Sequence, residues 1–166
     1  MESKSKSADK FANVMLASVT ETAASTLTFT QLPQITTLME KKAYLISRIE
    51  YQFDSGLFVA AGDGIMFGVS MQNTFTGPNI TTPSIIDFTR IVGKGAPVEV
   101  YDEIRDTDFS TLPGGGLLVP TRPMYLWAEG ASIAVAQTIR MRMYFTVADL
   151  NPSEYWDLVE AMQAYA

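Results

Sequence analysis

Residues 43–54 read AYLISRIEYQFD, and apolar and polar side chains alternate along most of this stretch. Successive side chains in a β-strand point to opposite faces, so the stretch predicts a strand with one apolar and one polar face. The apolar face holds Leu45, Ile49, Tyr51 and Phe53, and the polar face holds Arg48, Glu50 and Gln52. One buried and one solvated face is typical of a strand in an antiparallel sheet.

Similar segments lie on both sides of this stretch. Strands are predicted at residues 27–30, 65–71, 85–92, 97–104, 117–119, 123–129 and 132–147. We expect Gly62–Gly64 to close one hairpin and Glu129–Ala131 to close another, because glycine permits tight turns. The segments Asn73–Ser84 and Asp106–Arg122 lack a regular period and are rich in turn-forming residues, so they predict long loops. A break in the pattern at Ala136 and Gln137 indicates a bulge in the last strand.

A helix is predicted near the C-terminus. Asn151 is a favourable N-cap, Pro152 suits the first helical position, and Glu154 completes a capping box with Asn151. We expect the helix to run to about Ala164, with its apolar residues near one stripe. The stripe consists of Tyr155, Trp156, Val159 and Met162.

About eight short strands followed by one helix indicate an all-β protein, built as an antiparallel β-sandwich or barrel. We expect residues 13–150 to form this domain and residues 151–166 to form a helix with a short tail. Residues 1–12 are predicted to be a flexible N-terminal arm, because the opening MESKSKSADK carries little apolar surface. The arm is either an untethered terminus or a contact arm for nucleic acid or a neighbouring subunit.

The composition limits the chemistry that this chain can perform. It contains no histidine and no cysteine, which removes imidazole proton shuttles, thiolate nucleophiles, disulfides and Cys/His zinc sites. We therefore predict that the protein is not an enzyme and needs no cofactor. A hydrolase with two carboxylates and an oxygen-ligated metal site are the chemical alternatives that remain.

Charge and hydropathy indicate how the surface is used. Hydrophobic residues make up 47% of the chain and charged residues only 18%, below the roughly 25% typical of globular domains. This balance predicts apolar surface that is buried against other chains. The net charge is −6, so nucleic acid is expected to bind weakly if at all. We see neither a secretory signal nor a membrane span, and expect a soluble protein.

One acidic cluster is a candidate metal site. Asp102, Glu103, Asp106 and Asp108 lie close together in sequence, with Arg105 among them. Calcium prefers six to eight oxygen ligands, so this cluster is a candidate calcium site at an interface between subunits. The alternative is a solvated turn in which the acids pair with Arg105.

Two arginines and three aromatic residues are candidates for contacts with a partner. Arg140 and Arg142 share one strand face, where they form a polar outer face or interface, or bind phosphate or carboxylate groups. Tyr125 and Trp127 are candidates for an aromatic platform that binds a sugar or a base, and Tyr101 is a further aromatic residue that a binding module would use. At strand spacing, the alternative is that these aromatic side chains pack in a core.

Taken together, the strands, the long loops, the tail and the sparse charge resemble the single jelly-roll coat proteins of small icosahedral viruses. The resemblance covers roughly Ala43–Val147 and is one of layout. It implies a jelly-roll structural protein that self-assembles into a capsid or virus-like particle, in the virion and in the host cytoplasm during assembly. Its contacts would come from loops and termini. Many coat proteins have a strongly basic arm, whereas this one holds only Lys4, Lys6 and Lys10. Genome packaging by the arm is therefore not implied.

A second function is compatible with the same fold. A β-sandwich binding module of the lectin or adhesin type would use loop tips and exposed aromatic residues. The two functions differ in the state of the purified protein. A coat protein forms uniform closed particles, whereas a binding module remains a small species and binds a ligand.

Overall fold

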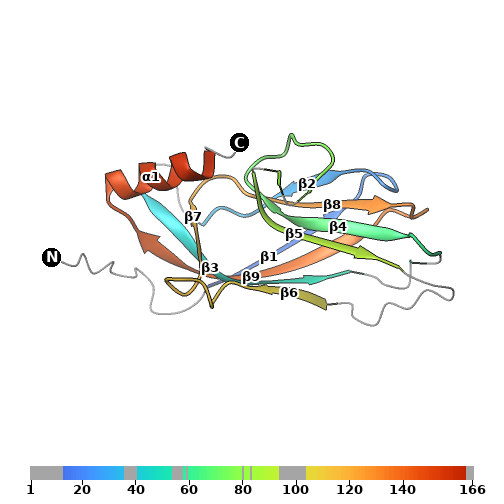
Figure 1. Cartoon of the computed structure of the whole chain (residues 1–166), viewed down its shortest axis with the longest axis horizontal. Helices are drawn as coiled ribbons and strands as arrows, with labels where there is room; N and C mark the ends of the chain where they lie inside the picture. The colour runs from blue at the N-terminus through green and yellow to red at the C-terminus, as the bar shows by residue number, and fades with distance from the viewer. Residues whose placement is uncertain are drawn as a thin grey trace.

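The structure is a computed structural model, and it describes residues 13–35, 41–53, 58, 60–79, 81–82, 84–93 and 104–163. Within these ranges the chain forms nine strands and one helix (Figure 1). The elements are β1 (Asn13–Thr20), β2 (Thr28–Gln31), β3 (Lys42–Gln52), β4 (Gly64–Ser70), β5 (Ile85–Val92), β6 (Ile104–Asp108), β7 (Leu117–Pro120), β8 (Tyr125–Ala131), β9 (Thr138–Asp149) and α1 (Pro152–Gln163). The arm predicted at residues 1–12 lies outside the described residues.

The strands form two antiparallel sheets that face each other. Sheet A has the order β1-β9-β3-β6, with β7 also paired to β3, and sheet B has the order β2-β8-β4-β5. The first strand pairs with the last, β2 with β8, β3 with β6 and β7, and β4 with β5. This nested pairing is that of an antiparallel ribbon wound into two sheets, which is a jelly roll. The predicted all-β sandwich with a C-terminal helix is confirmed.

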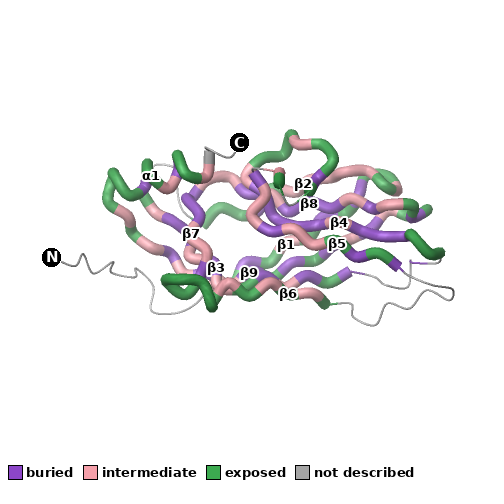
Figure 2. The backbone as a smooth tube through the Cα atoms, viewed as in Figure 1, coloured by how far each residue is buried: buried purple, intermediate pink, exposed green. Residues whose placement is uncertain are grey.

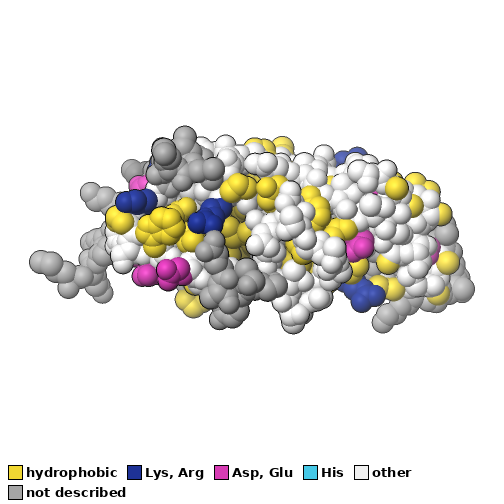
Figure 3. Space-filling view, turned by 90° about the horizontal axis from the view of Figure 1, so that it is seen from above, with side chains coloured by type: hydrophobic (Ala, Val, Ile, Leu, Met, Phe, Trp, Pro, Cys, Tyr) yellow, Lys and Arg dark blue, Asp and Glu magenta, His cyan; other side chains and the backbone are white. Residues whose placement is uncertain are grey.

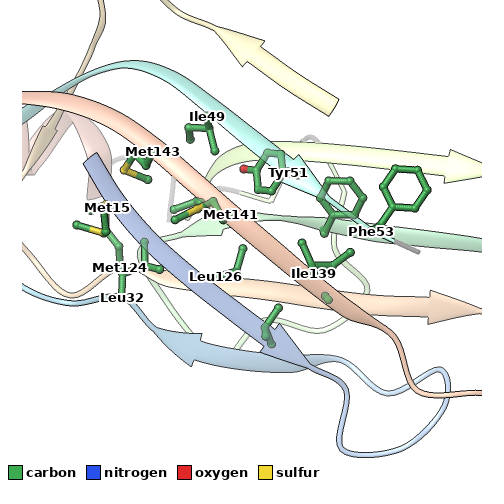
Figure 4. Packing of buried hydrophobic residues seen from close by; sticks show 14 of the residues in the cluster. Met15, Leu32, Ile49, Tyr51, Phe53, Met124, Leu126, Ile139, Met141 and Met143 are labelled. Carbon is green, nitrogen blue, oxygen red and sulfur yellow. The ribbon is translucent and has the colours of Figure 1, made fainter. Parts of the chain in front are cut away.

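The core fills the space between the two sheets (Figures 2 and 4). Ile49 and Met143 of sheet A and Phe67 and Leu126 of sheet B are fully buried. The rings of Tyr51 and Phe67 have centroids 5.0 Å apart and join the sheets. Truncating a core side chain to alanine costs about 2–5 kcal/mol. The core therefore fixes the position of both outer faces.

A bulge in β3 changes which side chains face the core. The register with β9 shifts between Ile46 and Arg48. Ile46 points inward before the shift and Ile49 after it, and both are fully buried. The prediction that Leu45 shares the face of Ile49 is therefore wrong, because the extra residue at the bulge reverses the alternation.

Both predicted hairpins are wrong. β3 lies in sheet A and β4 in sheet B, so the turn at Gly62–Gly64 connects two sheets rather than two paired strands. The predicted turn at Glu129–Ala131 lies within β8, and β9 belongs to the other sheet. Glycine provides the backbone freedom that a turn requires, as Gly62 shows with φ of 97°. It does not determine which strand the chain pairs with after the turn.

Several strand boundaries also differ from the prediction. The last strand begins at Thr138, because Ser132–Gln137 forms the crossing between the sheets. β6 occupies the start of the predicted loop Asp106–Arg122, where its side chains alternate opposite β3. None of the predicted strands corresponds to β1. The strand predicted at residues 97–104 lies, apart from Ile104, outside the described residues.

Helix α1 begins with the predicted capping box. The backbone N–H of Glu154 donates to Asn151 Oδ1 at 2.9 Å, and the N–H of Asn151 donates to Glu154 Oε2 at 3.0 Å. Tyr155 and Val159 are buried, so α1 packs on its own chain beside β7. Trp156 is 55% exposed, and its predicted place in the buried stripe is wrong because it lies about 100° around the helix from Tyr155. No helix among the described residues is long and apolar enough to span a membrane.

Candidate interaction surface

The outward side chains of sheet A form a regular grid across β1, β9, β3 and β6. Directly paired residues in an antiparallel sheet place their side chains on the same face, within reach of each other. Three rows result from this register: Val14, Tyr144, Arg48 and Asp108; Leu16, Arg142, Glu50 and Asp106; and Ser18, Arg140, Gln52 and Ile104. We call this grid the outer face of sheet A.

Ion pairs occupy the middle of the outer face. Arg48 Nη2 lies 3.2 Å from Glu50 Oε1 and 3.2 Å from Asp106 Oδ2. Arg142 Nη1 lies 3.8 Å from Glu50 Oε2, which also accepts a hydrogen bond of 3.2 Å from the Tyr144 hydroxyl. Surface pairs of this kind contribute about 0–1 kcal/mol each. Their main effect is to fix the orientation of the charged groups.

The structure separates the roles of the two predicted arginines. Both lie on the outer face of sheet A, on β9. Arg142 is paired with Glu50, whereas Arg140, which lies between Ser18 and Gln52, makes no ion pair within the described part of the chain. Arg140 is exposed and therefore the more available of the two for a charge on another molecule.

A hollow of about 530 Å³ lies on this face. Arg140, Arg142, Glu50 and residues of β1 and β6 line it. Its flanks are apolar, because Leu16 on one edge strand is 64% exposed and Ile104 on the other is 62% exposed. Large apolar side chains around a charged hollow are characteristic of an interaction site. Leu16 and Ile104 were not among the predicted contact residues, because apolar residues occur on both faces of β1 and the predicted strand at residues 97–104 does not by itself show which of its side chains are exposed.

The predicted acidic cluster is only partly described. Asp106 and Asp108 lie on β6, and Asp102 and Glu103 lie outside the described residues. Asp106 is paired with Arg48, and Asp108 Oδ1 accepts a hydrogen bond of 2.8 Å from the Ser110 N–H. Hydrogen bonds from Ser110 lower the pKa of Asp108. The residues that the structure describes contain no group of three acids positioned to hold a metal ion, and the calcium site stays a prediction.

The predicted aromatic platform is wrong for Trp127. This side chain points out of sheet B, but it is fully buried because the segment after β4 folds back over it. Phe75 from that segment packs edge-on against Trp127 at 5.6 Å and against Phe29 at 5.0 Å, and Phe88 covers another side at 5.9 Å. Tyr125 is half-buried, and Tyr101 lies outside the described residues.

A buried carboxylate joins the two sheets on the inner side. Asp87 of β5 accepts hydrogen bonds from the Tyr51 hydroxyl at 2.6 Å and from the Thr107 hydroxyl at 3.1 Å. Burial raises the pKa of Asp87, and the two hydroxyl donors partly oppose that rise. Burial, with the adjacent Asp87 charge, also raises the pKa of Tyr51 well above its usual value. Sequence patterns gave no sign of this contact.

A second buried carboxylate fixes the crossing from β8 to β9. Glu21 accepts hydrogen bonds from the backbone N–H groups of Gly130 at 2.7 Å, Gln137 at 2.8 Å and Thr26 at 3.0 Å. Burial, and then the charge of Glu21, raise the pKa of Glu129. Both buried acids therefore have evident structural roles.

Comparison with known proteins adds little beyond this geometry. No protein-family model and no curated protein matches the chain. A chain of the X-ray structure of tomato aspermy virus is similar over 86% of this chain and 79% of its own, with 10% identity and a TM-score of 0.46. A chain of desmodium yellow mottle tymovirus is similar over 86% of this chain and 90% of its own, with 8% identity and a TM-score of 0.33. The scores are low, and the jelly-roll class rests on the strand pairing of this chain.

Proposed function

We propose that this chain is a non-catalytic structural subunit that assembles with copies of itself into a closed shell, such as a viral capsid. The observation that carries the proposal is the outer face of sheet A. There, Leu16 and Ile104 remain exposed on either side of Arg140, a cation without an ion pair among the described residues. A face of this composition gains free energy when another protein covers it.

The use of the buried acids supports a structural role. Asp87 holds the two sheets together, and Glu21 holds the crossing between them. Each is engaged by donors of its own chain, so neither is presented to a substrate. The binding-module alternative is weakened, because Trp127 is covered by Phe75 and offers no platform.

The energetics favour many weak contacts over one strong contact. Burying a Leu or Ile side chain completely contributes about 1.5–3 kcal/mol. Association of two proteins costs about 4–15 kcal/mol of translational and rotational freedom. Covering Leu16 and Ile104 alone therefore gives weak pairing. A closed shell overcomes this limit because each subunit makes several such contacts at once.

The test is the assembly state of the purified protein, measured by size-exclusion chromatography with light scattering and by negative-stain microscopy. We expect uniform closed particles for the wild type. The variants Leu16→Asp and Ile104→Asp place a charge in the contact and are expected to remain small, with unchanged circular dichroism because both side chains are exposed. A wild type that stays monomeric at high concentration contradicts the proposal.

A further inference from the structure

Helix α1 presents an apolar and acidic side to solvent. Tyr155 and Val159 attach the helix to its own chain, while Trp156 is 55% exposed. Asp157 and Glu160 are also exposed, and α1 contains no lysine or arginine. Figure 3, viewed from above Figure 1, shows hydrophobic side chains at the end of the molecule where α1 lies, with both Lys/Arg and Asp/Glu side chains beside them.

The side chains on this part of α1 are arranged to act together. Residues three and four positions apart on a helix are neighbours on its surface. Trp156 therefore lies beside Glu160, and Asp157 lies beside Glu160 on the next row. Tryptophan is enriched among the residues that contribute most to protein interfaces, and the acids beside it on α1 favour a basic group on the partner.

The hollow on the outer face of sheet A has the complementary character. Leu16 and Ile104 supply apolar flanks, and Arg140 and Arg142 are the cations of the lining. Glu50 also lines the hollow and pairs with Arg142, so Arg140 supplies its net positive charge. Its volume of about 530 Å³ lies within the roughly 300–1,000 Å³ of sites that enclose drug-sized molecules, which are larger than an indole ring. An apolar ring with two carboxylates beside it matches this site in both shape and charge.

The helix cannot reach the hollow of its own chain. β3 and β9 run side by side from the pair Lys42 and Asp149 to the pair Gln52 and Arg140. At about 3.3 Å per residue, these ends lie roughly 30 Å apart. α1 begins just after Asp149, at the end where β3 begins (Figure 1), and Arg140 lies at the other. Helix α1 therefore does not fill the hollow of its own chain, and it is free to contact the hollow of a second copy.

We infer that Trp156 of one copy inserts into the hollow on sheet A of a second copy, with Asp157 and Glu160 facing Arg140 and Arg142. The contact is heterologous, because it joins two different surfaces of the same chain. Repeated heterologous contacts close into rings when the rotation between copies permits, and rings are the units from which a closed shell is built. The inference rests on the proposed function and specifies its contact.

Charge reversal on each side of the contact provides the sharpest experiment. One variant carries Arg140→Glu, and the other carries Asp157→Lys with Glu160→Lys. In each variant alone, the helix and the hollow have charges of the same sign, and we expect association to weaken by about tenfold or more. In an equimolar mixture, each helix meets a hollow of opposite charge, and we expect assembly to return. Asp149→Lys, an exposed acid outside α1 and the hollow, is the matched control and should assemble like the wild type.

The outcomes separate this contact from assembly in general. If the wild type assembles but the mixture stays unassembled, the helix contact is wrong and the proposed function stands. If the wild type does not assemble, the proposed function fails with it. Quenching by acrylamide gives a second readout, because Trp127 is buried and Trp156 is the exposed tryptophan. Protection of Trp156 on assembly is expected, and unchanged quenching overturns the inference.

Discussion

The hydrogen bond between Tyr51 and Asp87 offers the most quantitative test of the fold. Tyr51→Phe removes a donor that lies 2.6 Å from the carboxylate and leaves Thr107 as its remaining side-chain partner. A hydrogen bond to a charged group contributes about 1.5–3 kcal/mol. We therefore expect a loss of about 2 kcal/mol in the free energy of unfolding at neutral pH. For a domain of this size, that loss lowers Tm by roughly 4–8 °C.

The same contact predicts a pH dependence of known sign. Burial in the folded state raises the pKa of Asp87 above its ordinary value of 3.8, so the folded state binds more protons than the unfolded state between these two pKa values. The stability that Asp87 contributes is complete below pH 3.8 and declines as pH rises through the folded pKa. Asp87→Asn removes this titration. The stability of the wild type relative to Asp87→Asn should therefore fall as pH rises.

Urea unfolding across this pH range measures both effects. All of these measurements are made in protein that also carries Leu16→Asp. Without this substitution, self-assembly would make the measured stability depend on protein concentration. The Tyr51→Phe penalty should be larger at high pH, where Asp87 is ionised. A penalty below about 0.5 kcal/mol at neutral pH, or equal pH profiles for the wild type and Asp87→Asn, would refute the reasoning.

Three further predictions concern other parts of the molecule. Gly68→Ala places a Cβ in steric conflict with the carbonyl oxygen of Asp87, so we expect the free energy of unfolding in urea to fall by about 3 kcal/mol, and wild-type stability would contradict this. Phe75→Ala uncovers Trp127. In protein that also carries Trp156→Phe, so that the signal comes from Trp127, we expect a red shift of the fluorescence and a fall of about 1–3 kcal/mol in the free energy of unfolding. An unshifted spectrum would show that Phe75 is not the cover. The proposed calcium site predicts a higher Tm in millimolar calcium, and an unchanged Tm rules that site out.

The features that sequence predicted correctly depend on neighbours along the chain. The alternation in Ile85–Val92 corresponds to β5, and the capping box of Asn151 and Glu154 forms as expected. Both depend on interactions within a few residues, which the order of side chains specifies directly. The C-terminal helix and the all-β class follow from such local signals.

The errors concern choices made between distant residues. The turn at Gly62–Gly64 has the chemistry of a hairpin, but the strand after it pairs in the other sheet, where the jelly-roll winding places it. Leu45 changes face because of a bulge whose presence depends on pairing with β9. The position of Trp127 on the outward side of β8 is compatible with an exposed ring. Phe75, which is distant in sequence, nevertheless covers it.

The interaction surface was only partly predictable for the same reason. Arg140 and Arg142 share a face by their spacing alone, and the structure places both on the outer face of sheet A. Glu50, Leu16 and Ile104 come from other strands, and only the register of β1, β3, β6 and β9 brings them together. Arg140 can pair with a charge on another molecule because Glu50 pairs with Arg142 instead. The sequence does not specify which of the two arginines Glu50 contacts.

Sedimentation velocity of the purified wild type, over a wide range of concentration, tests the central claim most directly. If the outer face of sheet A joins copies of the chain, the protein should form discrete large species, and Leu16→Asp should reduce them to a species of 18.2 kDa. A wild type that sediments as an 18.2 kDa monomer at every concentration would contradict the account.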